Sequence, residues 1–383
     1  MNKTAINRLI LKLIDNTISE TESEALAIWL ESDDENLKYF NELIQVNYLI
    51  DSKQEFNHNE SLNRILNTTQ RKRRFSKKTW LYSVAASITI LLAVTFTTYK
   101  YNTTNSKPII VNNNIDNGTN KATLTIEDGS SIVLEKGQDY VASTGNIISN
   151  GEEIIYETKK TNLTKTAYNT LTIPRGGQFF LKLADGTQVW FNSETQLKYP
   201  VNFIDGETRQ VELVYGEAYF KVSHSTEHGG SSFKVLNDGQ EIEVLGTEFN
   251  IKAYKDEANL YTTLVTGKVA VSTDNTSTIL KPGEQSNLNS STKDFTVTTV
   301  DVYDQISWKE GIFSFKRKSL KNIMQVLSRW YDMDVTFENK ALENIGFNGA
   351  LGKDQNIQEI LETIKGSGVI KNYEINNKQV ILK

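Results

Sequence analysis

Few residues in this chain could carry catalytic or metal chemistry. The 383 residues include no cysteine, which excludes disulfides, cysteine-bound zinc, iron–sulfur clusters and thiol catalysis. Two of the three histidines, His224 and His228, have the i, i+4 spacing of a helical metal pair. The surrounding sequence, SHSTEHGG, is typical of a loop. We therefore predict no catalytic, cofactor-binding or metal-binding residue.

Motifs for nucleotide and hydrolase chemistry are also missing from the sequence. It contains no P-loop, dinucleotide fingerprint, nucleophile elbow, zincin or EF-hand pattern. The run Pro174-Arg175-Gly176-Gly177 resembles a turn into a strand and not a phosphate cradle. A net charge of −5 is too mild to indicate a general nucleic-acid-binding protein. We expect no enzyme, no cofactor and no direct nucleic-acid partner.

One apolar run divides the chain. Residues 80–99 carry no charge, and twenty residues at 1.5 Å each span about 30 Å, the thickness of a bilayer's hydrocarbon core. The basic juxtamembrane segment 71–79 holds six Lys and Arg residues, whereas only two lie soon after the run. A role of this basic segment in nucleic-acid binding is less favoured than a role in topology. We expect a single-pass inner-membrane protein with a cytoplasmic N-terminus and a periplasmic C-terminus.

Residues 1–70 predict a small all-α cytoplasmic domain. Apolar residues recur at helical spacing in residues 6–14 and about 36–50, and Thr21–Glu24 has the pattern of a capping box. Six basic residues against twelve acidic ones give this segment a net charge of −6. Because so short a segment hardly buries a core, its apolar stripes either form a bundle core or bind a partner. The candidate interface residues are Leu26, Trp29, Leu30, Leu37 and Phe40, with Trp29 as the preferred anchor.

The remainder of the chain predicts a linker and two further domains. Residues 100–120 are polar and rich in Asn, as linkers are. Short alternating runs separated by Gly and Asp turns predict an all-β domain over residues 121–300, of β-helix or sandwich type. Four aromatic residues are expected to pack between its strands and not to contact a substrate: Trp190, Tyr215, Tyr219 and Phe220.

Residues 303–383 predict a C-terminal α+β domain with duplicated βαβ units. A helix pattern from Ser319 to Tyr331 lies between two strand-like runs, and a second helix pattern follows 37 residues later. A small sheet with exposed edges can accept a strand from a partner, and the candidate edges are residues 312–315 and 369–375. The candidate docking residues are Ile312, Phe313, Phe315, Trp330 and Tyr331.

Several long stretches are similar to a known family. Residues 172–203, 209–222 and 243–254 resemble the FecR family of membrane-anchored anti-sigma factors, and residues 265–271 and 280–286 extend the similarity. Residues 308–337 resemble the C-terminal domain of Bacteroidetes-type members, which is related to the short N-terminal domain of secretins and TonB-dependent receptors. Residues 1–70 resemble the family only in their helical texture and in the element Glu22-Leu26-Trp29-Leu30.

The resemblance implies a transmembrane anti-sigma factor that controls transcription of uptake genes. It implies four partners: an extracytoplasmic-function sigma factor, the signalling domain of a TonB-dependent outer-membrane receptor, the lipid bilayer and an intramembrane protease. Whether proteolysis takes part, and whether control is inhibitory or activating, is left open. The alternatives are a membrane-anchored carbohydrate-binding or envelope scaffold protein and an anchored β-helical glycan-acting enzyme. The acidic helical module favours the regulator, because an anchored lectin or lyase needs no such domain.

Overall fold

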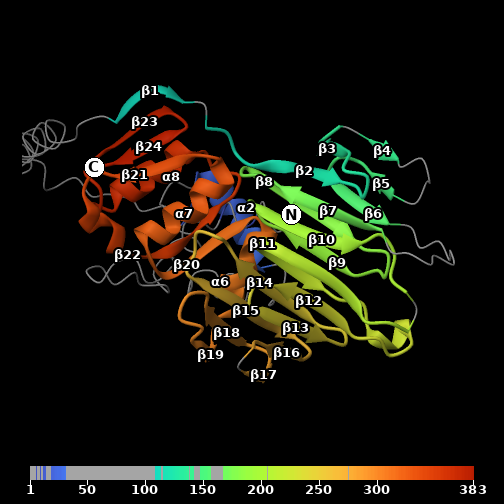
Figure 1. The fold of residues 1–383 in the computed structure, drawn as a ribbon. Coiled ribbons are helices and arrows are strands. Elements are labelled where there is room, and N and C mark those ends of the chain that lie inside the picture. The colour runs from blue at the N-terminus through green and yellow to red at the C-terminus, as the bar shows by residue number, and fades with distance from the viewer. Residues whose placement is uncertain are drawn as a thin grey trace, which may run out of the picture.

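The protein is predominantly β (Figure 1). The computed structural model describes residues 6, 9, 12, 13, 19–31, 108–113, 115–137, 139–141, 147–156, 167–204, 206–274 and 276–383. Of these residues, 48% lie in strands and 20% in helices.

The fold class expected from the sequence, with a small all-α domain and a transmembrane helix, is wrong for the residues that the structure describes. These residues form no separate all-α domain, and none of their helices is long and apolar enough to cross a membrane. Residues 80–99, on which the expected span lies, are outside the described residues. The expectation relied on hydropathy and short-range periodicity, which report the polarity of a segment and not the tertiary structure around it.

Helix α2 (Glu20–Glu31) begins with a capping box that involves other residues than predicted. The backbone N–H of Ser19 donates to Glu22 Oε2 at 3.0 Å, and the backbone N–H of Glu22 donates to Ser19 Oγ at 3.3 Å. The box therefore starts two residues before the predicted Thr21. Lys12 forms an ion pair with Glu22 at 2.5 Å. Hydrogen bonds from Lys12 and Ser19 lower the pKa of Glu22 to about 2.

Eighteen described strands form a two-layered β sandwich that shares strand β11 (Arg209–Lys221) between its layers. One layer has the order β4 (Tyr140–Val141), β5 (Ile147–Ser149), β6 (Glu153–Tyr156), β8 (Gly177–Lys182), β9 (Gln188–Phe191), β11, β14 (Glu248–Ala253), β15 (Asn259–Thr266), β18 (Glu284–Asn289), β19 (Phe295–Thr299). The other has the order β3 (Ser131–Glu135), β2 (Thr119–Thr125), β7 (Tyr168–Ile173), β10 (Thr195–Pro200), β11, β12 (Phe233–Asn237), β13 (Gln240–Val244), β16 (Val269–Ser272), β17 (Ser277–Leu280).

Strand β11 passes from one layer to the other at Gly216. This glycine has φ 101°, and a Cβ there would lie 2.3 Å from Thr195 Oγ1, so only glycine fits. Side chains from both layers meet between the sheets, among them Leu197 of β10 and Phe249 of β14. Strands such as β7 and β8 alternate buried and more exposed residues, as a half-buried strand does.

The C-terminal domain, residues 302–383, contains two strand–helix–strand units. The first is β20 (Ile312–Ser319), α7 (Leu320–Tyr331) and β21 (Asp334–Phe337); the second is β22 (Gly346–Gly352), α8 (Ile357–Gly366) and β23 (Tyr373–Asn377), followed by β24 (Gln379–Leu382). Three short helices, α6 (Val302–Ile306), η2 (Ser307–Glu310) and η3 (Lys340–Asn344), complete it. The side chains of Ser319 and Asn356 cap the starts of α7 and α8.

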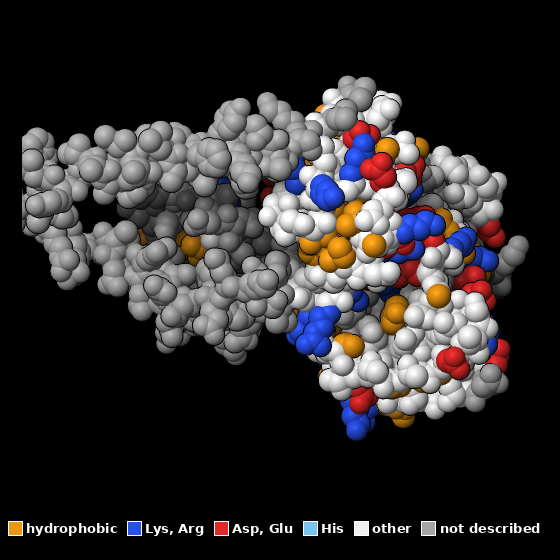
Figure 2. Space-filling view, turned by 90° about the vertical axis from the view of Figure 1, so that its left-hand side faces the viewer, with side chains coloured by type: hydrophobic (Ala, Val, Ile, Leu, Met, Phe, Trp, Pro, Cys, Tyr) orange, Lys and Arg blue, Asp and Glu red, His pale blue; other side chains and the backbone are white. Residues whose placement is uncertain are grey.

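The sheet of the C-terminal domain includes a strand from a distant part of the chain. Its order is β1-β23-β24-β21, where β1 (Ile109–Asn113) precedes the whole β sandwich in the sequence, and β20 pairs with β22 in a separate ribbon. Figure 1 shows β1 beside β23, with the chain continuing across to β2 of the sandwich. Figure 2 views this side of the molecule, where hydrophobic, basic and acidic side chains are interspersed.

Candidate functional site

The two histidines with metal-like spacing do not face one another. His224 caps the short helix η1 (Ser225–His228), and its Nδ1 lies 2.9 Å from Thr226 Oγ1. His228 Nε2 instead lies 2.8 Å from Ser223 Oγ. Across the described parts of the chain, no three His, Asp or Glu side chains gather in a group that could hold a metal ion. Residues 225–228 form a short 3-10 helix within the predicted loop, with His224 as its N-cap and His228 at its end.

The pair Ser223–His228 is structural and not a serine-hydrolase dyad. In a catalytic triad the carboxylate orients the imidazole. Here Asp185 Oδ2 accepts from Arg209 Nη1 at 2.8 Å, and Arg209 Nη1 also donates to Ser223 Oγ at 2.8 Å. The side chains of Asp185 and Arg209 are buried. Their ion pair therefore holds the loop before η1 in place and does not orient a nucleophile.

The β sandwich and the C-terminal domain meet at the C-terminal end of α7. The turn between β7 and β8 donates to the last carbonyls of this helix. Gly176 N–H donates to Arg329 O at 2.7 Å, and Arg175 Nη2 donates to Ser328 O at 3.1 Å and to Met333 O. Arg175 Nη1 also donates to Asp334 Oδ1 at 3.2 Å. A cation suits this helix end because its free carbonyls carry partial negative charge.

Arg329 on α7 is the main ionic contact of this interface. Its side chain is only 4% exposed. It lies 2.7 Å from Glu257 and 2.5 Å from Asp256, and its guanidinium stacks 3.6 Å from the centroid of the Tyr254 ring. Burial alone would lower the pKa of Arg329, but Tyr254 and the two carboxylates raise it above its ordinary value. The guanidinium thus remains charged and ties α7 to the loop after β14.

A second buried cation, Lys353, lies beside the same interface. It is 5% exposed, and its Nζ donates to Gln178 Oε1 at 3.1 Å and lies 3.5 Å from Asn192 Oδ1. Three aromatic rings also surround it, the nearest being Trp330 at 4.3 Å. Burial lowers the pKa of Lys353 to about 7, although Glu217 opposes this lowering.

Glu217 completes this buried polar group on the β11 side. Its carboxylate accepts from Asn192 Nδ2 at 2.9 Å and from Asn250 Nδ2 at 3.1 Å. Burial raises its pKa, and Lys252 and the two amides act in the opposite direction. Asn192 therefore bridges Glu217 and Lys353, two groups whose burial disfavours their charged forms.

Three of the four aromatic residues expected between the strands lie elsewhere. Phe220 is buried between the layers as expected. Tyr219 instead belongs to the core of the C-terminal domain, and Trp190 packs against that core from β9. Lys309 Nζ lies 4.9 Å from the Trp190 ring and 4.4 Å from the Tyr219 ring. Lys255 Nζ lies over the ring of Tyr215, 4.1 Å from its centroid. Outward-facing positions of a strand remain available to aromatic residues when a second domain covers the sheet.

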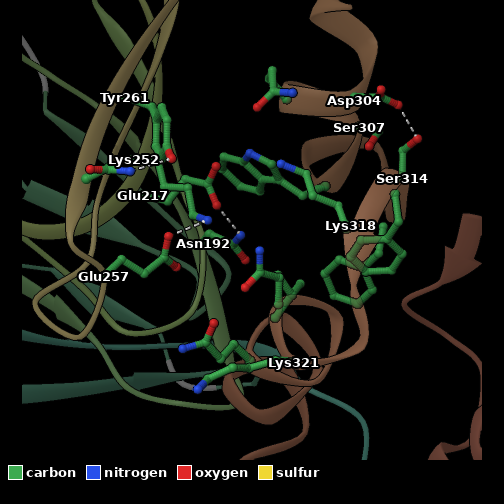
Figure 3. Close-up of a pocket in the computed structure, with 18 of the residues that line it drawn as sticks. Asn192, Glu217, Lys252, Glu257, Tyr261, Asp304, Ser307, Ser314, Lys318 and Lys321 are labelled. Carbon is green, nitrogen blue, oxygen red and sulfur yellow. Dashed lines mark hydrogen bonds and ion pairs between the residues drawn. The ribbon is translucent and has the colours of Figure 1, made fainter. Parts of the chain in front are cut away.

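A cavity of about 370 Å³ lies between the two domains (Figure 3). Glu217, Asn192 and Lys252 line it from the sandwich, and Asp304 and Lys318 line it from the C-terminal domain. Several of its polar groups bond to one another, as in the ion pair of Lys252 and Glu257 at 2.8 Å and the bond from Ser314 Oγ to Asp304 at 2.5 Å. The interface is not close-packed here, so separating the domains loses fewer contacts than opening a core.

The segment between β1 and β2 crosses this interface. Ile115 is buried in the core of the C-terminal domain, and Asn117 Nδ2 donates to Lys353 O at 3.3 Å. A Cβ on Gly118 would lie 2.5 Å from the ring of Trp330, so this glycine permits the close approach. Thr119 N–H then donates to Gly176 O at 2.9 Å. Part of the predicted linker thus contacts both domains.

The five predicted docking residues of the C-terminal domain are all buried. Their exposed fractions are 1–5%, and four of them belong to one core with Ile115 and Tyr219; the five are Ile312, Phe313, Phe315, Trp330 and Tyr331. Of the two predicted edges, β20 pairs only with β22 among the described strands, whereas β23 lies between β1 and β24. A partner could reach these side chains only if the domain opened, and main-chain edges are the accessible alternative.

The predicted partner-binding residues of the N-terminal segment are described in part. Leu26 is fully buried, and Trp29 and Leu30 are half-buried on α2. Leu37 and Phe40 lie outside the described residues. Ile28 was not among the candidates, yet 70% of its surface is exposed. The α2 helix therefore presents an apolar side chain to solvent at a position next to the predicted anchor.

Sequence reasoning missed the polar residues of the interface. Glu217, Arg329 and Lys353 are buried and each lie in or next to an apolar stretch, and a charge at a position that the surrounding pattern buries is the signal that could have identified them. Their partners come from elements far apart in the sequence. No local pattern indicates such pairs.

Known families match both domains. Residues 169–270 match the family described as FecR protein, and residues 312–382 match FecR, C-terminal. Two crystal structures of a candidate anti-sigma factor from Parabacteroides distasonis ATCC 8503, at 1.65 and 2.50 Å resolution, resemble the chain. In each case the TM-score is 0.51 and the identity 26%, over 56% of this chain and 98% of the crystallised one. No curated protein matches the sequence.

Proposed function

Because the chain belongs to the FecR family, we propose that it is an anti-sigma factor that binds an extracytoplasmic-function sigma factor and answers a TonB-dependent outer-membrane receptor. The family match and the similar crystal structures support the general part of this proposal, the regulation of a sigma factor. In this proposal the N-terminal segment acts in the cytoplasm and residues 108–383 lie in the periplasm. The intramembrane protease implied by the sequence resemblance stays a prediction.

One structural observation carries the proposal of signal transfer. The segment that leads from the N-terminal part pairs with the C-terminal sheet through β1 and then crosses to the sandwich. A change in the C-terminal domain therefore acts directly on the chain that leads to the sigma-binding segment. This arrangement suits a protein that passes a signal from one end of the chain to the other.

Sigma binding is assigned to α2 and the acidic segment around it. Leu26 is buried and supports the fold, whereas Ile28 is exposed and available to a partner. Sigma factors have basic DNA-binding surfaces, and the net charge of −6 over residues 1–70 complements them. We expect apolar contact from Ile28 with Trp29 beside it, and long-range attraction from the surrounding carboxylates.

The test is co-purification of the full chain with a set of co-expressed extracytoplasmic-function sigma factors. The variant Ile28→Asp should lose sigma binding while its circular dichroism stays unchanged. The matched control is Ile279→Asp, because Ile279 is 67% exposed on β17 of the sandwich. Wild-type binding by Ile28→Asp would reject the α2 contact. Failure of every sigma factor in the set to bind the wild-type chain would reject the proposed function.

A further inference from the structure

Strand β1 covers an edge of the C-terminal sheet that would otherwise be open. It pairs in parallel with β23, which pairs on its other side with β24. The two paired strands lie more than 260 residues apart in the sequence, so β1 is not part of a local hairpin. An uncovered strand edge is a ready template for another extended chain. The structure thus shows that the β23 edge accepts an extended segment.

The pairing of β1 with β23 is short and irregular. Four positions pair, from Ile109 with Glu374 to Asn113 with Asn377, and the register shifts between Ile110 and Asn112. Parallel pairing is also slightly less stable per residue than antiparallel pairing. Ile110 remains 42% exposed, so part of the strand's apolar surface is not buried. These features make β1 easier to detach than β24, whose pairing with β23 is regular.

The partner strand β23 is held firmly when β1 leaves. Tyr373 and Ile375 are buried in the core of the C-terminal domain, and Tyr373 OH donates to Glu362 at 2.9 Å. On the other side of β1, Ile115 and Gly118 fix the following segment against the same core. Detachment is therefore confined to β1 and to the chain that precedes it.

We propose that the β23 edge is the docking site for an extended strand of the signalling receptor, and that this strand takes the place of β1. The inference rests on the proposed function for the identity of the partner. Main-chain hydrogen bonds to β23 supply the affinity, as in other strand additions to a sheet edge. The receptor strand and β1 cannot occupy the β23 edge at the same time. Receptor binding therefore frees the segment that leads toward the sigma-binding part.

The edge can be tested without knowing either partner. The probe is a fluorescent peptide with the sequence of residues 108–113, and the full chain carries Ile110→Pro together with Val111→Pro. Alternate N–H groups of β1 point toward β23, so two consecutive prolines remove at least one donor. We expect the peptide to bind this variant about tenfold or more tightly than the wild type, whose own β1 competes for the edge. A peptide carrying the same two prolines is the control and should not bind.

A cross-link gives the second measurement. The chain has no cysteine, so Asn112→Cys and Asn376→Cys, at paired positions, supply the only two thiols and are expected to join β1 to β23 within one chain. The oxidised protein should not bind the peptide, and a matched disulfide between Thr125→Cys and Ser131→Cys in the β2–β3 hairpin should have no effect.

Three outcomes would overturn the docking proposal. They are a folded proline variant that does not bind the peptide, an oxidised β1–β23 variant that binds it as the wild type does, and a disulfide-linked dimer, which would indicate exchange of β1 between copies. None of these measurements involves a sigma factor, so failure of sigma binding would reject the proposed function and leave the edge site standing.

Discussion

Substitution of Lys353 by methionine tests whether the buried ammonium group of this residue lowers the free energy of unfolding. The side chain is 5% exposed, and burial lowers its pKa from the ordinary 10.5 to about 7. A difference of this size corresponds to about 5 kcal/mol, at about 1.4 kcal/mol for each pH unit. The nearby rings of Trp330, Phe313 and Trp308 favour the charged form, so 5 kcal/mol is an upper figure.

The sign of the pH dependence follows from the two pKa values. Between pH 7 and pH 10.5 the unfolded chain holds a proton on Lys353 that the folded chain lacks. The contribution of this group to stability therefore rises with pH across that window, by about 1.4 kcal/mol for each unit. Below pH 7 both states hold the proton, and the full cost of burying the ammonium group is present.

The assay is urea unfolding of the full chain at pH 7, 8, 9 and 10. We expect Lys353→Met to be more stable than the wild type by about 2–4 kcal/mol at pH 7, because methionine fills the site without a charge. The difference should shrink as the pH rises toward 10. The control is Lys136→Met, whose side chain is 82% exposed and whose ion pair with Glu152 contributes little. A difference between Lys353→Met and wild type that stays constant with pH would refute the reasoning.

Two further substitutions address the same interface. Arg329→Met should lower the free energy of unfolding by about 2–4 kcal/mol, because it leaves Glu257 with fewer partners in a site shielded from water; a loss below about 1 kcal/mol in urea unfolding would contradict this. Gly118→Val should cost about 1–3 kcal/mol because its Cβ would clash with Trp330, and tryptophan fluorescence should report the displaced ring. The control Gly346→Ala has no atom within 4 Å of the added Cβ, and equal loss in both variants would contradict the clash.

Features set by neighbouring residues could be predicted from the sequence. The helix pattern from Ser319 to Tyr331 corresponds to α7, with Ser319 as its N-cap. Alternating apolar residues and Asp-Gly turns indicated the strands around Asp128 and Asp185. In these cases the periodicity and the capping side chain act within a few residues of one another.

Features set by distant residues could not be predicted. The polar, Asn-rich run that contains β1 has the composition of a linker, and its pairing with β23 has no local signature. Tyr219 and Phe220 are adjacent aromatic residues on opposite faces of β11, so composition alone cannot assign one to each core. The predicted capping box at Thr21 competed with an equally good pattern at Ser19, and only the position of the helix start distinguishes them. The prediction of an all-α domain inferred tertiary structure from such local patterns, and it was wrong for the described residues.

Three properties of the domain interface favour a protein that changes state over one selected for maximal stability. The buried ammonium group of Lys353 disfavours the closed arrangement, the cavity removes packing contacts, and β1 pairs irregularly with β23. The three are physically connected, because Lys353 O accepts from both Asn117, in the segment after β1, and Trp330 Nε1 on α7. The segment that follows β1 thus contacts the residue whose burial disfavours the closed arrangement. A strand exchange at β23 therefore requires only a modest difference in free energy to free the chain that precedes β1.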